Sequence, residues 1–259
     1  MKTNKRRLML IDSIRGLAIL SMIGFHACWI MSYFGILIST ARVDSFEFLI
    51  WERSICCTFI FISGFSFGLG RKQLKKGIII LLIGIAITIL SVLFMYDIRD
   101  IFGILWILGL SPIIMTCADK YIEKKTNTNK KLLVICLILA TVLLLVTWNI
   151  NLGYLGLKSL NAYIYLPRGL YKGYFMTFLG FQAPGFYSVD YFSVFPWFFL
   201  YLMGYFTYKI SRGSKFEGKV LTVGIPFVKT IGKYSLPIYL IHPVIIFILC
   251  YLTYMFVLK

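Results

Sequence analysis

The run that decides the fold class is IDSIRGLAILSMIGFH, residues 11–26. It places Asp12 and Arg15 at the start of an otherwise apolar segment and His26 deep inside it. On a helix Asp12 and Arg15 share a face. His26 then lies roughly 21 Å beyond Asp12, past the middle of a hydrocarbon core about 30 Å thick. An ionisable group is costly to keep at that depth, so we interpret His26 as a functional residue.

The composition extends this interpretation to the whole chain. Of the 259 residues, 59% are hydrophobic and 14% are charged, and the mean hydropathy is +0.85. A soluble domain does not need so much apolar surface, and the apolar runs are continuous, unlike the alternating strands of a transmembrane barrel. We therefore predict an all-α polytopic membrane helix bundle in which residues 1–259 form a single domain. The start, MKTNKRR, leads into a long apolar span without a cleavage site, so no secretory signal peptide is expected.

We predict seven transmembrane helices, because seven apolar runs approach the length of about 20 residues that a crossing needs. They cover residues 8–34, 47–69, 77–96, 101–118, 132–150, 191–210 and 231–258. Most of the 27 Lys and Arg residues flank these runs on one side, which places the N-terminus in the cytoplasm and the C-terminus outside. The longest loop, residues 151–190, is then external. Its aromatic rings suit either stacking on sugar faces or anchoring at the lipid headgroups.

The net charge of +17 does not indicate nucleic-acid binding, because the basic residues lie beside the spans. There they set topology and meet anionic lipid. Six cysteines show no CxxC spacing, and most lie within apolar runs. We interpret them as small core residues, and the sequence indicates neither a disulfide framework nor a metal site.

Two histidines are candidates for chemistry. Glu52 lies at about the same estimated height as His26, and it could orient and charge-stabilise the imidazole of a general base. The alternative is a structural arrangement of Glu52 and Arg53 at the outer interface. His242 lies between Pro237 and Pro243, roughly 13 Å in from the cytoplasmic side, where it could bind the thioester of a donor. For each histidine the alternative is a packed, hydrogen-bonded core residue.

Basic residues at the cytoplasmic ends of the first two spans form a candidate anion site. Arg15 and Arg71, with Asp12 and Lys72, could accept the phosphates of a coenzyme, because a guanidinium pairs bidentately with phosphate. The alternative is ordinary positive-inside charge with an Asp12–Arg15 pair. Gly16 follows Arg15 and permits close backbone approach.

Five motifs, in chain order, resemble the bacterial heparan-α-glucosaminide N-acetyltransferase-like catalytic domain family. They are residues 11–26 above, FIFISGFSFGLGRK (59–72), FGILWILGLS (102–111), DYFSVFPWFFLYLMGYF (190–206) and GKYSLPIYLIHPVII (232–246). The first motif is also similar to the acyltransferase type 3 family, in which RG followed by an intramembrane histidine marks the site. The resemblance covers nearly the whole chain.

This resemblance implies a multi-span membrane acyltransferase that passes acetyl from cytoplasmic acetyl-CoA to a sugar acceptor across the membrane. It implies a catalytic role for His26 and a supporting role for Arg15. The family usually has a histidine after FGIL, where this chain has Trp106. We place Trp106 at the acceptor-binding surface. Arg53, Asp190 and Trp197 are assigned to the same surface.

We therefore predict a multi-pass acetyltransferase of the bacterial plasma membrane, with acyl-CoA, a sugar or glycan acceptor and the bilayer as partners. His26 would take a proton from the acceptor hydroxyl or amine, a task that suits an imidazole. Direct transfer and a covalent acyl-histidine both stay open, as does homo-oligomerisation. The competing predictions are a proton-coupled transporter or lipid-binding membrane protein without covalent chemistry, and a structural membrane subunit.

Overall fold

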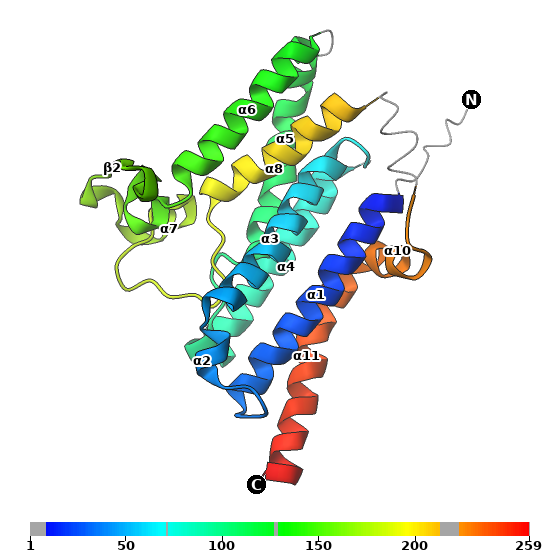
Figure 1. The fold of residues 1–259 in the computed structure, drawn as a ribbon, viewed down its shortest axis with the longest axis vertical. Helices are drawn as coiled ribbons and strands as arrows, with labels where there is room; N and C mark the ends of the chain where they lie inside the picture. The colour runs from blue at the N-terminus through cyan, green and yellow to red at the C-terminus, as the bar shows by residue number, and fades with distance from the viewer. Residues whose placement is uncertain (1–8, 71, 127–128, 213–222, 259) are drawn as a thin grey trace. The chain divides into compact units, whose positions relative to one another are not determined.

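The computed structural model describes residues 9–70, 72–126, 129–212 and 223–258, and these are mostly helical (Figure 1). The chain divides into two compact units. Unit 1 comprises residues 1–59 and 211–259, and unit 2 comprises residues 60–210. The main helices are α1 Met9–Tyr33, α2 Thr40–Val43, α3 Phe46–Phe67, α4 Gln73–Phe94, α5 Ile104–Thr126, α6 Lys130–Thr147, α7 Gly173–Leu179, α8 Val194–Ser211, α10 Pro226–Lys233 and α11 Ser235–Thr253.

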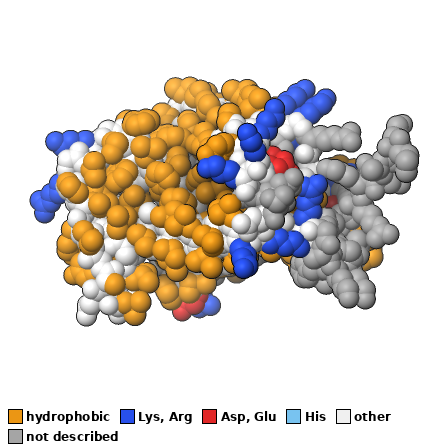
Figure 2. All heavy atoms as spheres, turned by 90° about the horizontal axis from the view of Figure 1, so that it is seen from above, with side chains coloured by type: hydrophobic (Ala, Val, Ile, Leu, Met, Phe, Trp, Pro, Cys, Tyr) orange, Lys and Arg blue, Asp and Glu red, His pale blue; other side chains and the backbone are white. Residues whose placement is uncertain are grey.

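In the part of the chain that the structure describes, six helices are long and apolar enough to cross a membrane. These are α1, α3, α4, α5, α6 and α11. On α4 the buried residues are Gly77, Gly84 and Ser91, which recur at every seventh position and therefore share one face. The other faces of α4 expose large apolar side chains, as expected of a helix that faces lipid. Figure 2 shows hydrophobic side chains over much of the visible surface. The protein is a multi-pass membrane protein.

The prediction of seven spans is not confirmed at residues 191–210. There α8 runs from Val194 to Ser211, and Phe195 has non-helical backbone angles of φ −99° and ψ 133°. The regular part of the helix is therefore shorter than the run of apolar residues suggested. At the end of the chain, the first residues of the predicted span 231–258 belong to a separate short helix, α10, which ends at Lys233. The long helix α11 begins at Ser235.

Unit 1 is built around α1, which packs against α10 and α11. Glycines allow α1 and α10 to approach at backbone distance. A Cβ atom on Gly16 would lie 2.1 Å from the carbonyl oxygen of Val228, and one on Gly232 would lie 1.7 Å from that of Asp12. The Ser13 hydroxyl also stabilises the contact between α1 and α10, because it accepts a hydrogen bond from the backbone N–H of Ile225 at 3.0 Å. The close approach predicted at Gly16 is therefore confirmed.

In unit 2, two further pairs of helices also approach closely at glycine residues. The C-terminal part of α3 crosses α8 at two glycines. A Cβ atom placed on Gly64 would lie 1.9 Å from the carbonyl oxygen of Tyr201, and one placed on Gly204 would lie 2.0 Å from that of Phe61. Helices α4 and α5 pair along Gly77 and the other glycines of their interface. Within the predicted external loop, β1 Tyr154–Leu157 and β2 Ala162–Tyr165 form an antiparallel hairpin, which is followed by α7.

Candidate active site

The two histidines lie together in unit 1. The ring of His26, on α1, meets the ring of His242, on α11, with centroids 5.0 Å apart and planes at 66°. Sequence spacing had placed them at different depths, His26 above and His242 nearer the cytoplasmic side. The structure corrects this, because α1 and α11 pack side by side and bring the rings to one level. The residue assigned to the donor and the residue assigned to the chemistry therefore belong to one site.

The hydrogen bonding of His242 leaves one nitrogen available. Its Nδ1 lies 2.9 Å from the carbonyl oxygen of Ile238, which can only accept, so Nδ1 carries the proton. The side chain is buried, with 6% exposure, and Nε2 has no hydrogen-bond partner among the described residues. In the neutral ring Nε2 then holds a lone pair, which can accept a proton from a bound group. A buried polar atom without a partner is uncommon, so this nitrogen is a candidate for binding a ligand or an ordered water.

Aromatic side chains surround His26 and His242. Phe25 contacts His26 edge-on at 5.8 Å and contacts Trp51 of α3 at 5.6 Å. The indole N–H of Trp51 donates to the Ser21 hydroxyl at 2.7 Å, which fixes the orientation of its ring. Tyr239 lies 6.1 Å from His242 on the same helix. The imidazoles therefore lie in an apolar surrounding, where electrostatic interactions are stronger than in water.

The opposite end of α1 carries the predicted donor site. Arg15 Nη1 lies 3.6 Å from Asp12 Oδ1, and the Arg15 side chain stays 28% exposed. The adjacent helix α10 adds two lysines, Lys229 and Lys233, to this end of unit 1. Arg71, the other predicted coenzyme ligand, lies outside the described residues.

Glu52 and Arg53 lie on α3, directly after Trp51, and both are half-buried. Their predicted roles, orienting the imidazole and binding the acceptor, stay predictions. Among the described residues, no group of three or more His, Cys, Asp or Glu side chains could hold a metal ion.

The three other predicted acceptor residues lie in unit 2, and each has a structural contact there. Asp190 Oδ2 accepts a hydrogen bond from the backbone N–H of Ile104, the first residue of α5. The indole of Trp106 donates to the Thr88 hydroxyl at 3.0 Å. Trp197 is buried, with 5% exposure, among Trp148 and Phe192. Their assignment to the acceptor surface stays a prediction.

Asp100, which precedes α5, was missed from the sequence. Burial and the neighbouring Asp190 carboxylate raise the pKa of Asp100 to about 8. Its backbone N–H donates to the Ser91 hydroxyl at 2.9 Å, and its Oδ1 is buried without a hydrogen-bond partner among the described residues. The only sequence signal was two aspartates in a short turn between apolar runs, Asp97 and Asp100, which did not distinguish the buried one.

An ion-pair cluster between α5 and α8 was also missed. Lys209 Nζ lies 3.2 Å from Asp119 Oδ1 and 3.5 Å from Glu123 Oε1, and the lysine side chain is only 10% exposed. The Tyr205 hydroxyl donates to the same Asp119 oxygen. These groups satisfy one another, so the cluster links two helices of unit 2.

Comparison with known families decides the relationship. The model of the family described as heparan-alpha-glucosaminide N-acetyltransferase, catalytic, matches residues 7–244. The chain belongs to this family. The resemblance drawn from the five motifs is thereby confirmed, and a membrane acetyltransferase is the activity that the family indicates. In comparisons with curated proteins and with solved structures, nothing matches the chain.

Proposed function

We propose that the protein transfers an acetyl group from acetyl-CoA to a sugar or glycan acceptor, with His26 and His242 forming the proton-handling centre. The observation that carries this proposal is the contact between the two rings, together with the unpaired buried Nε2 of His242. Family membership supplies the acetyl transfer in general. The donor, the acceptor and the roles of the residues are our inference from the geometry.

The proposed reaction is a direct acyl transfer. An acceptor hydroxyl or amine attacks the thioester carbonyl of acetyl-CoA, while His26 takes the proton that the attacking atom loses. The carbon–sulfur bond breaks, and the coenzyme leaves as a thiol after regaining a proton from the imidazolium. Contact with His242 holds the His26 ring in place and supplies a second basic nitrogen in the same site. A covalent acyl-histidine is the alternative route.

The two ends of unit 1 suit the two substrates. Arg15, with the lysines of α10, offers cationic groups to the phosphates of the coenzyme. His26 lies eleven positions after Arg15, which corresponds to about 16 Å along α1. A coenzyme whose phosphates bind Arg15 must therefore extend over about this distance for its thioester to reach the histidines. The acceptor then approaches from the C-terminal end of α1, which the charge distribution predicts to be external.

The experiment that tests this proposal uses purified full-length protein in detergent micelles with radiolabelled acetyl-CoA and glucosamine. We expect coenzyme binding, slow hydrolysis without acceptor and labelled N-acetylglucosamine with it. A protein that neither binds nor turns over acetyl-CoA contradicts the proposal. That result favours the transporter or lipid-binding alternative, in which the histidines carry protons without covalent chemistry.

A further inference from the structure

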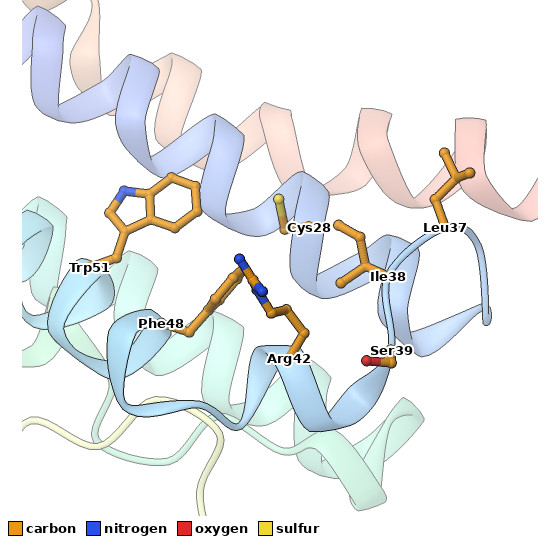
Figure 3. Close-up of a pocket in the computed structure, with 7 residues that line it drawn as sticks. All are labelled: Cys28, Leu37, Ile38, Ser39, Arg42, Phe48 and Trp51. Carbon is orange, nitrogen blue, oxygen red and sulfur yellow. The ribbon is translucent and has the colours of Figure 1, made fainter.

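Unit 1 has a cavity of about 510 Å³ that opens widely to the surface at the C-terminal end of α1. Its lining comes from Cys28 of α1, loop residues 37–39, Arg42 of α2, and Phe48 and Trp51 of α3 (Figure 3).

Arg42 supplies the charge of the cavity. Figure 3 shows its side chain extending from α2 toward Phe48. A guanidinium stays charged at all physiological pH values and pairs bidentately with phosphate or carboxylate. The Glu47 carboxylate interacts electrostatically with Arg42, but it is fully exposed and is hydrogen-bonded to Ser45. The ion pair between Glu47 and Arg42 is therefore weak, because water screens it, and an incoming anion can replace Glu47 as the partner of Arg42.

The rest of the lining is mainly apolar. Leu37, which is 91% exposed, lies beside Ile38 in the loop. The rings of Phe48 and Trp51 meet edge to face, with their centroids 5.4 Å apart. A free inorganic anion gains nothing from such an apolar surface, and a neutral lipid forms no charge-assisted pair with a guanidinium. The combination fits a molecule that carries an anionic group and an apolar chain together.

We propose that this cavity binds a phosphate-bearing amphiphile, with the phosphate on Arg42 and the apolar chain against Leu37, Ile38 and Phe48. The cavity adjoins the histidine pair through Phe25, which contacts Trp51 on one side and His26 on the other. If the proposed function holds, the amphiphile is the acceptor itself, a sugar joined through phosphate to a lipid. Its sugar then lies toward Trp51 and the histidines.

The test measures binding of dodecyl phosphate to full-length protein in dodecyl maltoside micelles, which provide a neutral sugar amphiphile in excess. Arg42→Gln is expected to weaken binding about tenfold or more, because it removes a charge-assisted pair. Ser39→Asp is expected to weaken it as well. It places a negative charge in the lining at the N-cap of α2, where aspartate is well tolerated. Arg168→Gln, at an exposed position in unit 2, is the matched control and is expected to bind as wild type.

Inorganic phosphate is expected to bind at least tenfold more weakly than dodecyl phosphate, because it lacks the apolar chain. Equal affinities for the two probes, or equal affinity of Arg42→Gln and Arg168→Gln for dodecyl phosphate, overturn the proposal.

The source of the amphiphile follows from the transfer assay. Inhibition by dodecyl phosphate that is competitive with the acceptor assigns the phosphate to a lipid-linked acceptor. Binding without inhibition assigns it to a phospholipid of the bilayer, which has the same chemistry and also supports the site. Failure of the proposed function is distinguishable from both, because acetyl transfer from acetyl-CoA is then absent while Arg42-dependent binding persists.

Discussion

The rings of His26 and His242 lie 5.0 Å apart in edge contact, although they come from the first and last long helices of the chain. This contact makes the two histidines one site. Under the function we propose, the buried Nε2 of His242, which has no hydrogen-bond partner among the described residues, is available to a reacting group.

The first prediction concerns the donor end of α1. Arg15→Lys is expected to weaken coenzyme A binding about tenfold, because lysine keeps the charge but lacks the planar fork that pairs with phosphate. Titration calorimetry of the detergent-solubilised protein measures the affinity, with Arg168→Lys as the control. Unchanged affinity would reduce Arg15 to a partner of Asp12 that does not contact the coenzyme.

The second prediction concerns the crossing of α1 and α10. Gly232→Ala places a methyl group 1.7 Å from the Asp12 carbonyl oxygen, so the helices must separate. We expect destabilisation of about 1–3 kcal/mol, seen as a lower Tm in a thermal shift assay. Gly169→Ala is the control, because its Cβ meets nothing within 4 Å. Equal Tm values for the two variants would contradict the close approach.

The third prediction concerns Asp100 and pH. Its pKa of about 8 lies above the ordinary value of 3.8, so between these values the folded protein holds a proton that the unfolded chain has lost. The stabilisation is therefore fully present below about pH 4 and is lost as pH rises through 8. Asp100→Asn cannot ionise, so its Tm advantage over wild type should grow from pH 5 to pH 9. The exposed Asp97→Asn should show no such trend, and a trend shared by both variants would exclude Asp100 as the cause.

The fourth prediction concerns topology. Three of the six long apolar helices, α4, α5 and α6, separate Lys75 from Leu160, so the two positions should lie on opposite sides of the membrane. With the native cysteines replaced, Lys75→Cys should react with an impermeant thiol reagent only from the cytoplasm, and Leu160→Cys only from outside. The sides follow from the distribution of Lys and Arg. Reversed labelling would invert the donor and acceptor ends proposed for unit 1.

Much of the helical architecture could be predicted, because apolar runs near 20 residues leave few alternatives in a membrane. The seventh span, at α8, is not confirmed. The helix has 18 residues, but it contains three tyrosines and Lys209, so it is less apolar than the six helices that are long and apolar enough to cross a membrane. The predicted run 191–210 drew its apolar character mainly from the Phe, Leu and Val residues between these polar groups.

The candidate site was predicted in part. His26 and the Arg15–Gly16 step stand out from one motif, since a charged group and a glycine are unusual in an apolar helix. The contact with His242 depends on how α11 packs on α1, which spacing along one helix cannot give. The burial of Asp100 and the cavity at Arg42 likewise arise from tertiary packing.

The central claim is that His26 and His242 act as one proton-handling centre, and acetyl transfer by single and double variants tests it most directly. Initial rates from acetyl-CoA to glucosamine are measured for wild type, His26→Asn, His242→Gln and the double variant, with Leu20→Ala on the exposed face of α1 as control. We predict losses of about 10²- to 10⁴-fold for His26→Asn, a smaller loss for His242→Gln, and a double variant no slower than His26→Asn. Coenzyme binding should persist in His26→Asn. Transfer by His26→Asn at a near wild-type rate would contradict the account.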